Sequence, residues 1–171
     1  MKDRVLLLGM MGSGKTTVGT ALSSRLGWPY LDNDVLLERT AGARAPEILA
    51  AHGDEGLREA ESRVLTVLLA LPGPVIVGIP GGVVLSEVDR GRIVGAGAHV
   101  VWLKASPAVL SRRVGSGAGR PRLGDDPLAA LRVLAAERNG FFEEVADQVI
   151  DTDTLPAGAI AKAIVNALET A

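Results

Sequence analysis

The stretch "LLLGMMGSGKTTVG", residues 6–19, decides the fold. A run of aliphatic residues is followed by glycines, one lysine and two threonines, after which the sequence becomes amphipathic. Residues 9–16 match the pattern G-x-x-x-x-G-K-[ST] of a phosphate-binding loop. Its glycines let successive backbone N–H groups approach phosphate oxygens, and the helix that follows directs its positive end toward the same anion. We therefore expect a nucleoside triphosphate as the ligand.

Individual residues of this loop have distinct expected roles. Lys15 would reach the β- and γ-phosphates, and Thr16 would offer its hydroxyl to Mg²⁺. Thr17 adds a further hydroxyl at the start of the helix, where it either binds the nucleotide or is only structural. The loop residues expected to bind ATP are Gly12, Ser13, Gly14, Lys15, Thr16 and Thr17.

Strands and helices alternate in the predicted secondary structure, which is typical of an α/β fold. The aliphatic runs predict strands at 4–8, 29–31, within 74–82, 98–105 and 147–152. The helical spacing of apolar residues predicts helices at 16–26, 34–40, 45–52, 54–70, from Pro107 onward, 128–145 and 156–169. With neither an internal repeat nor a long linker, residues 1–171 are expected to form one P-loop kinase domain. The expected fold is that of three-layer P-loop NTPases, a central five-stranded parallel sheet with helices on both faces.

The composition excludes several classes of function. The 18 lysines and arginines nearly balance the 20 aspartates and glutamates, so neither nucleic acid nor a membrane surface is an expected partner. The sequence contains no cysteine, which excludes disulfides and thiolate metal sites. The apolar stretch near the start is short and broken by glycine, unlike a signal peptide or a membrane span. We expect a cytoplasmic protein and, from its small size and balanced charge, a monomer.

The phosphate loop alone is compatible with several classes of nucleotide-binding protein. A GTPase would carry an N-K-x-D sequence, which is absent, and most motors need more than 171 residues. A small-molecule kinase needs carboxylates near the metal and a cationic lid. Asp32 and Asp34 follow a short strand, where one would hold magnesium through water and the other would accept a proton from the acceptor, unless they are only a helix N-cap pair. The stretch 115–127, rich in glycine and proline, is expected to be a mobile lid.

Several stretches, in this order and spacing, resemble the shikimate kinase family of nucleoside monophosphate kinase-like P-loop proteins over essentially the whole chain. They are "GMMGSGKTTVG", "LDNDVLLERTAG", "ILAAHGDEGLREAE", "GGVV", "GRPRL" and "ERNGFFEEVAD" followed by "DT". The resemblance implies a kinase that transfers the γ-phosphate of ATP to a hydroxyl of shikimate, in aromatic amino acid biosynthesis, with Mg²⁺ as cofactor. It also implies that the helical region 33–61 binds this acceptor.

The resemblance assigns five residues to the acceptor. Asp34 would hydrogen-bond the acceptor hydroxyl as the base. Arg58 and Arg138 would bind the acceptor's carboxylate, because planar guanidinium groups suit a carboxylate and two of them imply an acidic substrate. Gly81 and Gly82 would present their backbone close to the substrate ring.

Other residues are assigned by the same resemblance to ATP and to catalysis. Asp32 would lie on the magnesium side of the site, and Arg113 on the face of the adenine. Arg120, in the lid, would swing over the transferring phosphoryl group and neutralise its charge together with Lys15. The residues expected to be catalytic are thus Asp34, Lys15 and Arg120.

The remaining charged residues near these stretches receive lesser roles. Glu61 lies one helical turn after Arg58 and would orient this arginine. Arg44, Arg122 and Arg132 are expected to be charges of the surface or the lid, because an arginine on an exposed helix usually makes a solvated ion pair of little consequence.

The sequence departs from the family pattern at three positions near the expected acceptor. Pro80 replaces the first of three glycines and so removes one backbone N–H. Gly78 replaces a hydroxyl residue that helps to hold a metal-bound water, and Leu57 replaces an aromatic residue. Two alternatives therefore stay open beside shikimate. One is a kinase of another carboxylated polyol or cyclitol, such as gluconate or an aminoshikimate-like compound, and the other is an ATP-binding paralogue with impaired catalysis.

Overall fold

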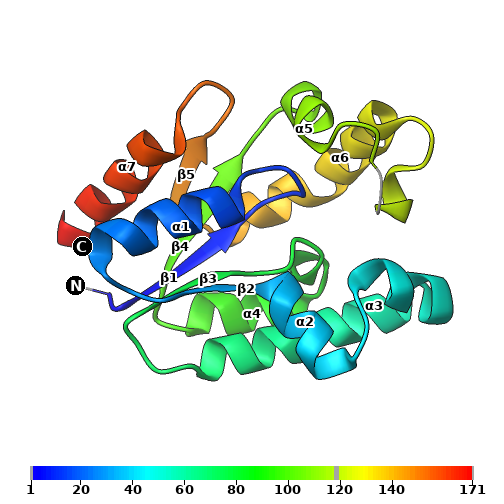
Figure 1. Cartoon of the computed structure of the whole chain (residues 1–171). Coiled ribbons are helices and arrows are strands. Elements are labelled where there is room, and N and C mark those ends of the chain that lie inside the picture. The colour runs from blue at the N-terminus through cyan, green and yellow to red at the C-terminus, as the bar shows by residue number, and fades with distance from the viewer. Residues whose placement is uncertain (1, 118–119, 171) are drawn as a thin grey trace.

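The computed structural model describes residues 2–117 and 120–170, which form a three-layer α/β structure (Figure 1). Its sheet has five strands, all parallel, in the order β2-β3-β1-β4-β5. The strands are β1 (Arg4–Leu8), β2 (Tyr30–Asp32), β3 (Val75–Gly78), β4 (His99–Lys104) and β5 (Gln148–Asp151). The predicted fold class, a five-stranded parallel sheet between layers of helices, is confirmed.

Helices cover both faces of the sheet. On one face lie α1 (Lys15–Leu26) and α7 (Ala157–Thr170), which pack against each other. On the other face lie α2 (Asn33–Ala41), α3 (Ala45–Ala70), α4 (Glu87–Gly95), α5 (Pro107–Val114) and α6 (Pro127–Val145). Two 3-10 turns, η1 (Val83–Leu85) and η2 (Pro121–Leu123), complete the described elements. Among the described helices, none combines the length and the apolar character that a bilayer span requires.

The central strand explains why the chain needs two hydrophobic cores. Leu6 and Leu8 point to the core on the side of α3 and α6, and Val5 and Leu7 point to the core on the side of α1 and α7. All four side chains are at most 1% exposed. A strand buried on both faces has no polar face, and a continuous aliphatic run is therefore the expected sequence.

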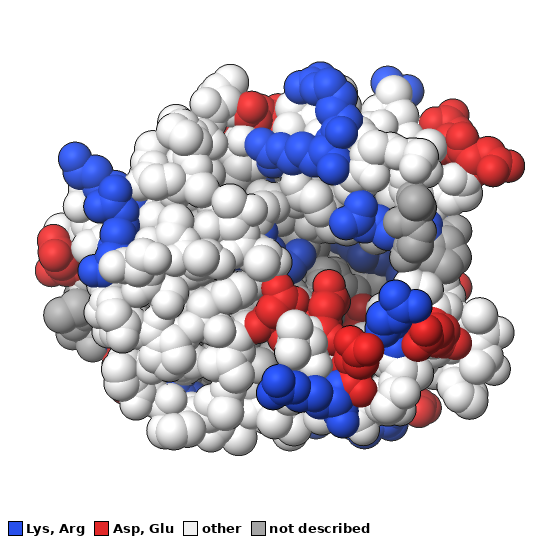
Figure 2. All heavy atoms as spheres, viewed as in Figure 1, with Lys and Arg blue, Asp and Glu red and all other residues white. Residues whose placement is uncertain are grey.

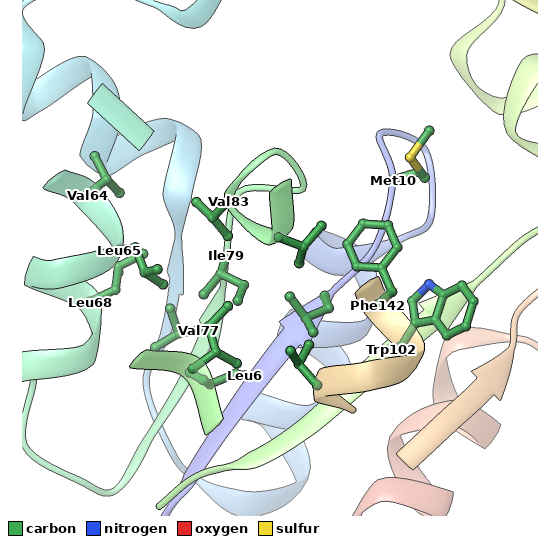
Figure 3. Packing of buried hydrophobic residues seen from close by; sticks show 14 of the residues in the cluster. Leu6, Met10, Val64, Leu65, Leu68, Val77, Ile79, Val83, Trp102 and Phe142 are labelled. Atoms are coloured by element: carbon green, nitrogen blue, oxygen red, sulfur yellow. The ribbon is translucent and has the colours of Figure 1, made fainter. Parts of the chain in front are cut away.

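The two largest aromatic side chains of the core lie beneath the phosphate loop. The rings of Trp102 and Phe142 are stacked with their centroids 5.7 Å apart. Met10, the second residue of the loop, is 4% exposed and packs in the same core (Figure 3). The Met10 side chain thus anchors the loop in the core.

Glycines set several element boundaries. Gly27 ends α1 in the left-handed conformation (φ 70°), as the sequence predicted. The helices predicted at 45–52 and 54–70 are the two halves of α3, which is kinked at Gly53 (φ 65°, ψ −168°). Of the predicted lid, residues 118–119 lie outside the described part of the chain.

The helix α4 was not predicted, although the sequence contains a signal for its start. Ser86 caps this helix, and its hydroxyl accepts a hydrogen bond from the backbone N–H of Asp89 at 3.2 Å. A serine followed three residues later by an acidic residue is the usual beginning of a capping box. The apolar residues of α4 are too few to show helical spacing, since Ile93 is its one buried aliphatic side chain.

The topology places the loops that follow the strands at one edge of the sheet. The strands are parallel, so their carboxyl ends meet there, and the connections on the two sides of β1 run in opposite directions. Such a change of direction opens a crevice next to the central strand. The phosphate loop follows β1 directly and therefore lies in this crevice.

We expect Gly19→Ala to lower the free energy of unfolding by about 1–3 kcal/mol, because a Cβ at Gly19 would overlap the ring of Tyr30 and overpack this contact. Gly140→Ala, also within a helix but with open space around the new Cβ, is the matched control. It should raise the same free energy by about 0.5–1 kcal/mol through helix propensity. Urea denaturation of both variants measures the difference, and equal effects would refute the tight contact.

Candidate active site

A cavity of about 840 Å³ lies at the carboxyl edge of the sheet. Figure 2 shows the hollow, with acidic and basic side chains facing each other around its mouth. The phosphate loop, the start of α2, the kinked α3, the turn after β3 and the segment before α6 form its walls. The predicted site residues that line it are Gly12, Ser13, Gly14, Lys15, Thr16, Thr17, Asp32, Asp34, Gly81, Gly82, Arg113, Arg120 and Arg138.

The phosphate loop has the conformation that its glycines allow. Gly12 and Gly14 have φ values of 80° and 97°, a region that disfavours residues with a side chain. The Lys15 ammonium bends back across the loop and donates to the carbonyl oxygen of Gly9 at 2.9 Å. The Ser13 hydroxyl is buried and has no hydrogen-bond partner. The loop thus presents donors and a cation toward the cavity.

Lys15 is half-buried and lies among carboxylates. Burial lowers the pKa of Lys15, and the negative charges of Asp34, Asp32 and Glu61 oppose this shift. An ammonium that has lost much of its hydration gains more from a phosphate than an exposed lysine does. The side chain is therefore suited to bind the terminal phosphates of a nucleotide.

Asp32 and Thr16 form the metal side of the cavity. The Thr16 hydroxyl donates to Oδ2 of Asp32 at 2.6 Å, and the Tyr30 hydroxyl donates to the same oxygen at 3.1 Å. Oδ1 of Asp32 accepts the backbone N–H of Asp34 at 2.9 Å, so the carboxylate also caps α2. Both alternatives that the sequence left open for Asp32, a cap and a place near the metal, are compatible with this geometry.

This set of oxygens fits Mg²⁺. A hydroxyl and a carboxylate are hard ligands, and Mg²⁺ is usually held by one or two protein oxygens with its other ligands from water and phosphates. In the described part of the chain, no group of three or more His, Asp or Glu that could hold a metal by itself occurs. Thr16 and Asp32 are the residues that would hold the ion.

Asp34 lies next to Lys15, and its pKa differs from that of an ordinary aspartate. Burial raises the pKa of Asp34, as does the nearby charge of Asp32, while Lys15 and a 2.7 Å hydrogen bond from the Asn33 side chain oppose the rise. A carboxylate with a raised pKa is a stronger base than an ordinary aspartate. Its place beside the phosphate loop suits a base that receives a proton from an acceptor.

Arg138, Arg122 and Glu61 line the side of the cavity where the sequence predicts the acceptor. Arg138, on α6, is 4% exposed, and its Nη2 has no hydrogen-bond partner. Arg122, which the sequence analysis left as a surface or lid charge, also lines the cavity and has a buried Nε without a partner. Burial lowers the pKa of Arg138, and the charge of Arg122 lowers it further. Two guanidinium groups that each keep a buried N–H without a partner make a site for an anion.

Arg122 is held in place from outside the cavity. Its guanidinium forms an ion pair with Asp54, which follows the kink of α3 at Gly53. The pair joins the segment before α6 to the second half of α3. Its partner could not be inferred from the sequence, because the two residues are 68 positions apart.

The structure does not bring Arg58 together with Arg138, as the predicted carboxylate clamp would require. Leu57 and Glu61 line the cavity, whereas Arg58 is exposed and does not. Arg58 lies about 100° around the helix from Leu57, so its side chain leaves the cavity wall. The cations whose charges act on the Glu61 carboxylate are Arg122, Arg138 and Lys15, and Arg58 is not among them.

Gly81 and Gly82 are needed because other groups approach them closely. A Cβ at Gly81 would stand 2.9 Å from the carbonyl oxygen of Gly9, and one at Gly82 would overlap the carboxylate of Glu61. The turn after β3 thus packs between the phosphate loop and α3. Pro80 precedes it in the cavity wall and offers no N–H there.

The far end of the cavity is suited to a nucleobase. Arg113 donates to the carbonyl oxygen of Thr152 at 2.6 Å and to that of Gly12 at 3.4 Å, so it joins the loop after β5 to the phosphate loop. Leu155 and Ile160 give this end apolar surface. Sequence reasoning had placed Arg113 here but did not predict this apolar wall.

We expect Glu61→Gln to be more stable than the wild type at pH 8 by up to about 3 kcal/mol, and no more stable at pH 4. Burial raises the pKa of Glu61 to about 7 against the opposing charges of Arg122 and Arg138. The folded protein therefore keeps a proton that the unfolded chain releases, and the stability from this proton is lost as the pH rises from about 4.5 to 7. Glutamine imitates the protonated form at every pH.

Denaturation of the ligand-free protein at both pH values measures this effect. Glu59→Gln, on the exposed side of the same helix, is the control and should change stability by no more than about 0.5 kcal/mol at either pH. A stabilisation by Glu61→Gln that does not change with pH would contradict the prediction.

Comparisons with known proteins identify the family of this chain. The sequence model of the shikimate kinase family ("SKI: Shikimate kinase") matches residues 11–169. A shikimate kinase of Symbiobacterium thermophilum is 43% identical over 152 residues, which are 87% of this chain and 86% of that protein. The structure of a shikimate kinase from Acinetobacter baumannii in complex with shikimate is 31% identical, with a TM-score of 0.91 over 98% of this chain and 93% of that one.

A more distant likeness shows how widely the fold is shared. The structure of a gluconokinase from Sinorhizobium meliloti 1021 is 20% identical and has a TM-score of 0.67, over 99% of this chain and 93% of that one. At this identity the likeness shows the fold alone. The match of the family sequence model, together with close relatives over most of their length, is more specific: the chain belongs to the shikimate kinase family.

Proposed function

We propose that this protein transfers the γ-phosphoryl group of ATP to a ring hydroxyl of shikimate. The observation that carries the proposal is the pair of arginines on the acceptor side, Arg138 and Arg122, which have buried N–H groups without partners. A carboxylate is planar and would pair with both. Membership of the shikimate kinase family supports shikimate as the acid that supplies it.

The two ends of the acceptor would then serve different purposes. With its carboxylate between Arg138 and Arg122, a small cyclic acid would direct a hydroxyl toward Asp34 and the phosphate loop, because all of these groups line one cavity. Asp34 would orient this hydroxyl and accept its proton. The raised pKa of Asp34 suits this role.

On the phosphate side, Lys15 and Arg120 would bear the charge that develops on the transferring group. Both lie close enough to affect each other electrostatically, since the positive charge of Arg120 lowers the pKa of Lys15. Thr16 and Asp32 are the residues that would hold Mg²⁺, which supplies charge neutralisation on the phosphates when bound.

A kinase of another carboxylated polyol is the second candidate. The observation that favours it is the changed acceptor wall, in which Leu57 and Pro80 line the cavity. These residues alter its shape but leave Arg138, Arg122 and Asp34 in place, so an acidic acceptor is common to both candidates. The two differ only in the carbon skeleton that must fit between the cations and the base.

We expect shikimate at millimolar concentration to stimulate the release of ADP from ATP and Mg²⁺, measured in a coupled assay. Gluconate and other sugar acids, tested in parallel, should stimulate it far less. Stimulation by a sugar acid alone would favour the second candidate. ATP binding by calorimetry without stimulation by any acid would instead identify a catalytically impaired paralogue.

Three matched variants in the same assay test the carboxylate site. Arg138→Met and Arg122→Met should each raise the KM for shikimate by about 10- to 100-fold, the effect of losing a hydrogen bond between charged groups. Arg58→Met, outside the cavity, should change it by less than about threefold. An equal effect of Arg58→Met and Arg138→Met would refute the proposal that Arg138 and Arg122 together bind the carboxylate.

Arg120→Ala should lower kcat by about 100- to 1,000-fold and change the KM for shikimate little, because this cation would act on charge that appears only during transfer. Arg132→Ala, on α6, is the control for loss of a positive charge that does not line the cavity. Steady-state kinetics with both substrates varied separates the two constants. Equal losses in kcat and in affinity would argue against this role of Arg120.

A further inference from the structure

Tyr30 is the only tyrosine of the sequence. Its side chain lies against α1 and the end of β3, at a glycine of each. Its ring covers Gly19 of α1, where a Cβ would overlap the ring. Its hydroxyl reaches Gly78 at the end of β3, where a Cβ would stand 2.7 Å from the hydroxyl oxygen. The ring and the hydroxyl thus occupy space that side chains at these two glycines would otherwise fill.

The hydroxyl reaches the metal side of the cavity. It donates to Oδ2 of Asp32 at 3.1 Å, the oxygen that also accepts the Thr16 hydroxyl at 2.6 Å. The other oxygen of Asp32 accepts the backbone N–H of Asp34 at 2.9 Å. Three donors therefore fix the orientation of this carboxylate. One of them is the hydroxyl of Tyr30, which lies on the same strand, β2, as Asp32.

The surroundings keep the hydroxyl in its donor form. Burial raises the pKa of Tyr30 well above its usual range, and the charge of Asp32 raises it further. The hydroxyl also lies against β3 at Gly78, where a Cβ would stand 2.7 Å from its oxygen. The contact with Asp32 is thus built by packing as well as by charge.

We propose that Tyr30 is a positioning residue for magnesium: its hydroxyl holds Asp32 beside the Thr16 hydroxyl, and Gly78 is required because any side chain there would displace it. The proposal rests on the nucleotide- and Mg²⁺-binding part of the proposed function and is independent of the acceptor. Tyr30 does not itself line the cavity, so it acts through Asp32.

Calorimetric titration of the whole protein with ATP at several Mg²⁺ concentrations, without acceptor, tests the role of the hydroxyl. Tyr30→Phe keeps the ring over Gly19 and removes only the hydrogen bond. The Mg²⁺ concentration that half-maximally tightens ATP binding should rise by about 3- to 10-fold, as for one hydrogen bond to a charged group. ATP affinity in EDTA should not change. An unchanged Mg²⁺ requirement overturns the positioning role, whereas a wild type that binds no ATP refutes the proposed function instead.

A double variant tests the role of Gly78. Gly78→Ser alone should raise the Mg²⁺ requirement at least as much as Tyr30→Phe, because its Cβ displaces the hydroxyl. Combining Gly78→Ser with Tyr30→Phe removes the collision, and the double variant should need less Mg²⁺ than Gly78→Ser alone. Gly91→Ser, at a glycine with open surroundings, is the control for the substitution itself. A double variant no better than Gly78→Ser overturns the steric requirement.

A spectroscopic measurement keeps the proposal testable if Gly78→Ser does not fold. Protein labelled with ¹³C at tyrosine Cζ gives one resonance, because the sequence has one tyrosine. In the ligand-free protein Asp32→Asn should shift this resonance, since it changes the acceptor of the hydroxyl's hydrogen bond. Asp34→Asn, whose carboxyl does not contact the hydroxyl, should shift it much less. Equal shifts, or none, overturn the contact on which the proposal depends.

Discussion

Met10 fastens the phosphate loop to the hydrophobic core, and the positions of the other site residues depend on that anchor. Its side chain is buried in the core that contains Phe142 (Figure 3). Phe142 also lies beneath Gly81, whose Cβ would stand 3.9 Å from the ring. On α6, Arg138 precedes Phe142 by one helical turn and therefore shares its face. One packing arrangement thus sets the distance between the phosphate side and the acceptor side.

The cavity gathers charges that do not satisfy one another. Arg138 is buried and Arg122 half-buried, and the charge of Arg122 lowers the pKa of Arg138. The pKa of Glu61 is raised to about 7 because burial outweighs the attraction of both arginines. Buried charges without matched partners are costly, and native structures rarely keep them without a functional reason. Anionic ligands would supply the missing partners. The same groups that lower the stability of the free protein are therefore those that would bind the substrates.

The sequence was most informative where one short segment determines both structure and chemistry. The phosphate loop and its lysine lie within eight consecutive residues, and Asp32 and Asp34 follow a strand directly, so their positions needed no knowledge of distant contacts. Arg138 was predicted only through the family resemblance, because nothing in α6 distinguishes it from a surface arginine. Local patterns could not predict which side chains share the cavity, because this depends on contacts between distant segments.

Arg58 and Arg122 show this limit most clearly. Both lie in stretches that match the family, yet the structure places Arg122 in the cavity and Arg58 outside it. Which residue enters depends on the rotation of α3 after its kink at Gly53 and on the pairing of Arg122 with Asp54. Both are contacts between distant segments, and one sequence without relatives cannot reveal them.

The three departures from the family pattern have unequal consequences. At Gly78 the missing hydroxyl is offset by that of Tyr30, which fills the vacated space and hydrogen-bonds Asp32. Leu57 remains buried at 4% exposure and still closes the cavity wall, although with a smaller side chain. Pro80 removes a donor that no neighbouring residue replaces. The changes therefore leave the phosphate side intact and alter only the acceptor wall, which argues for a working kinase with its own fit to the acceptor and against a paralogue that has lost catalysis.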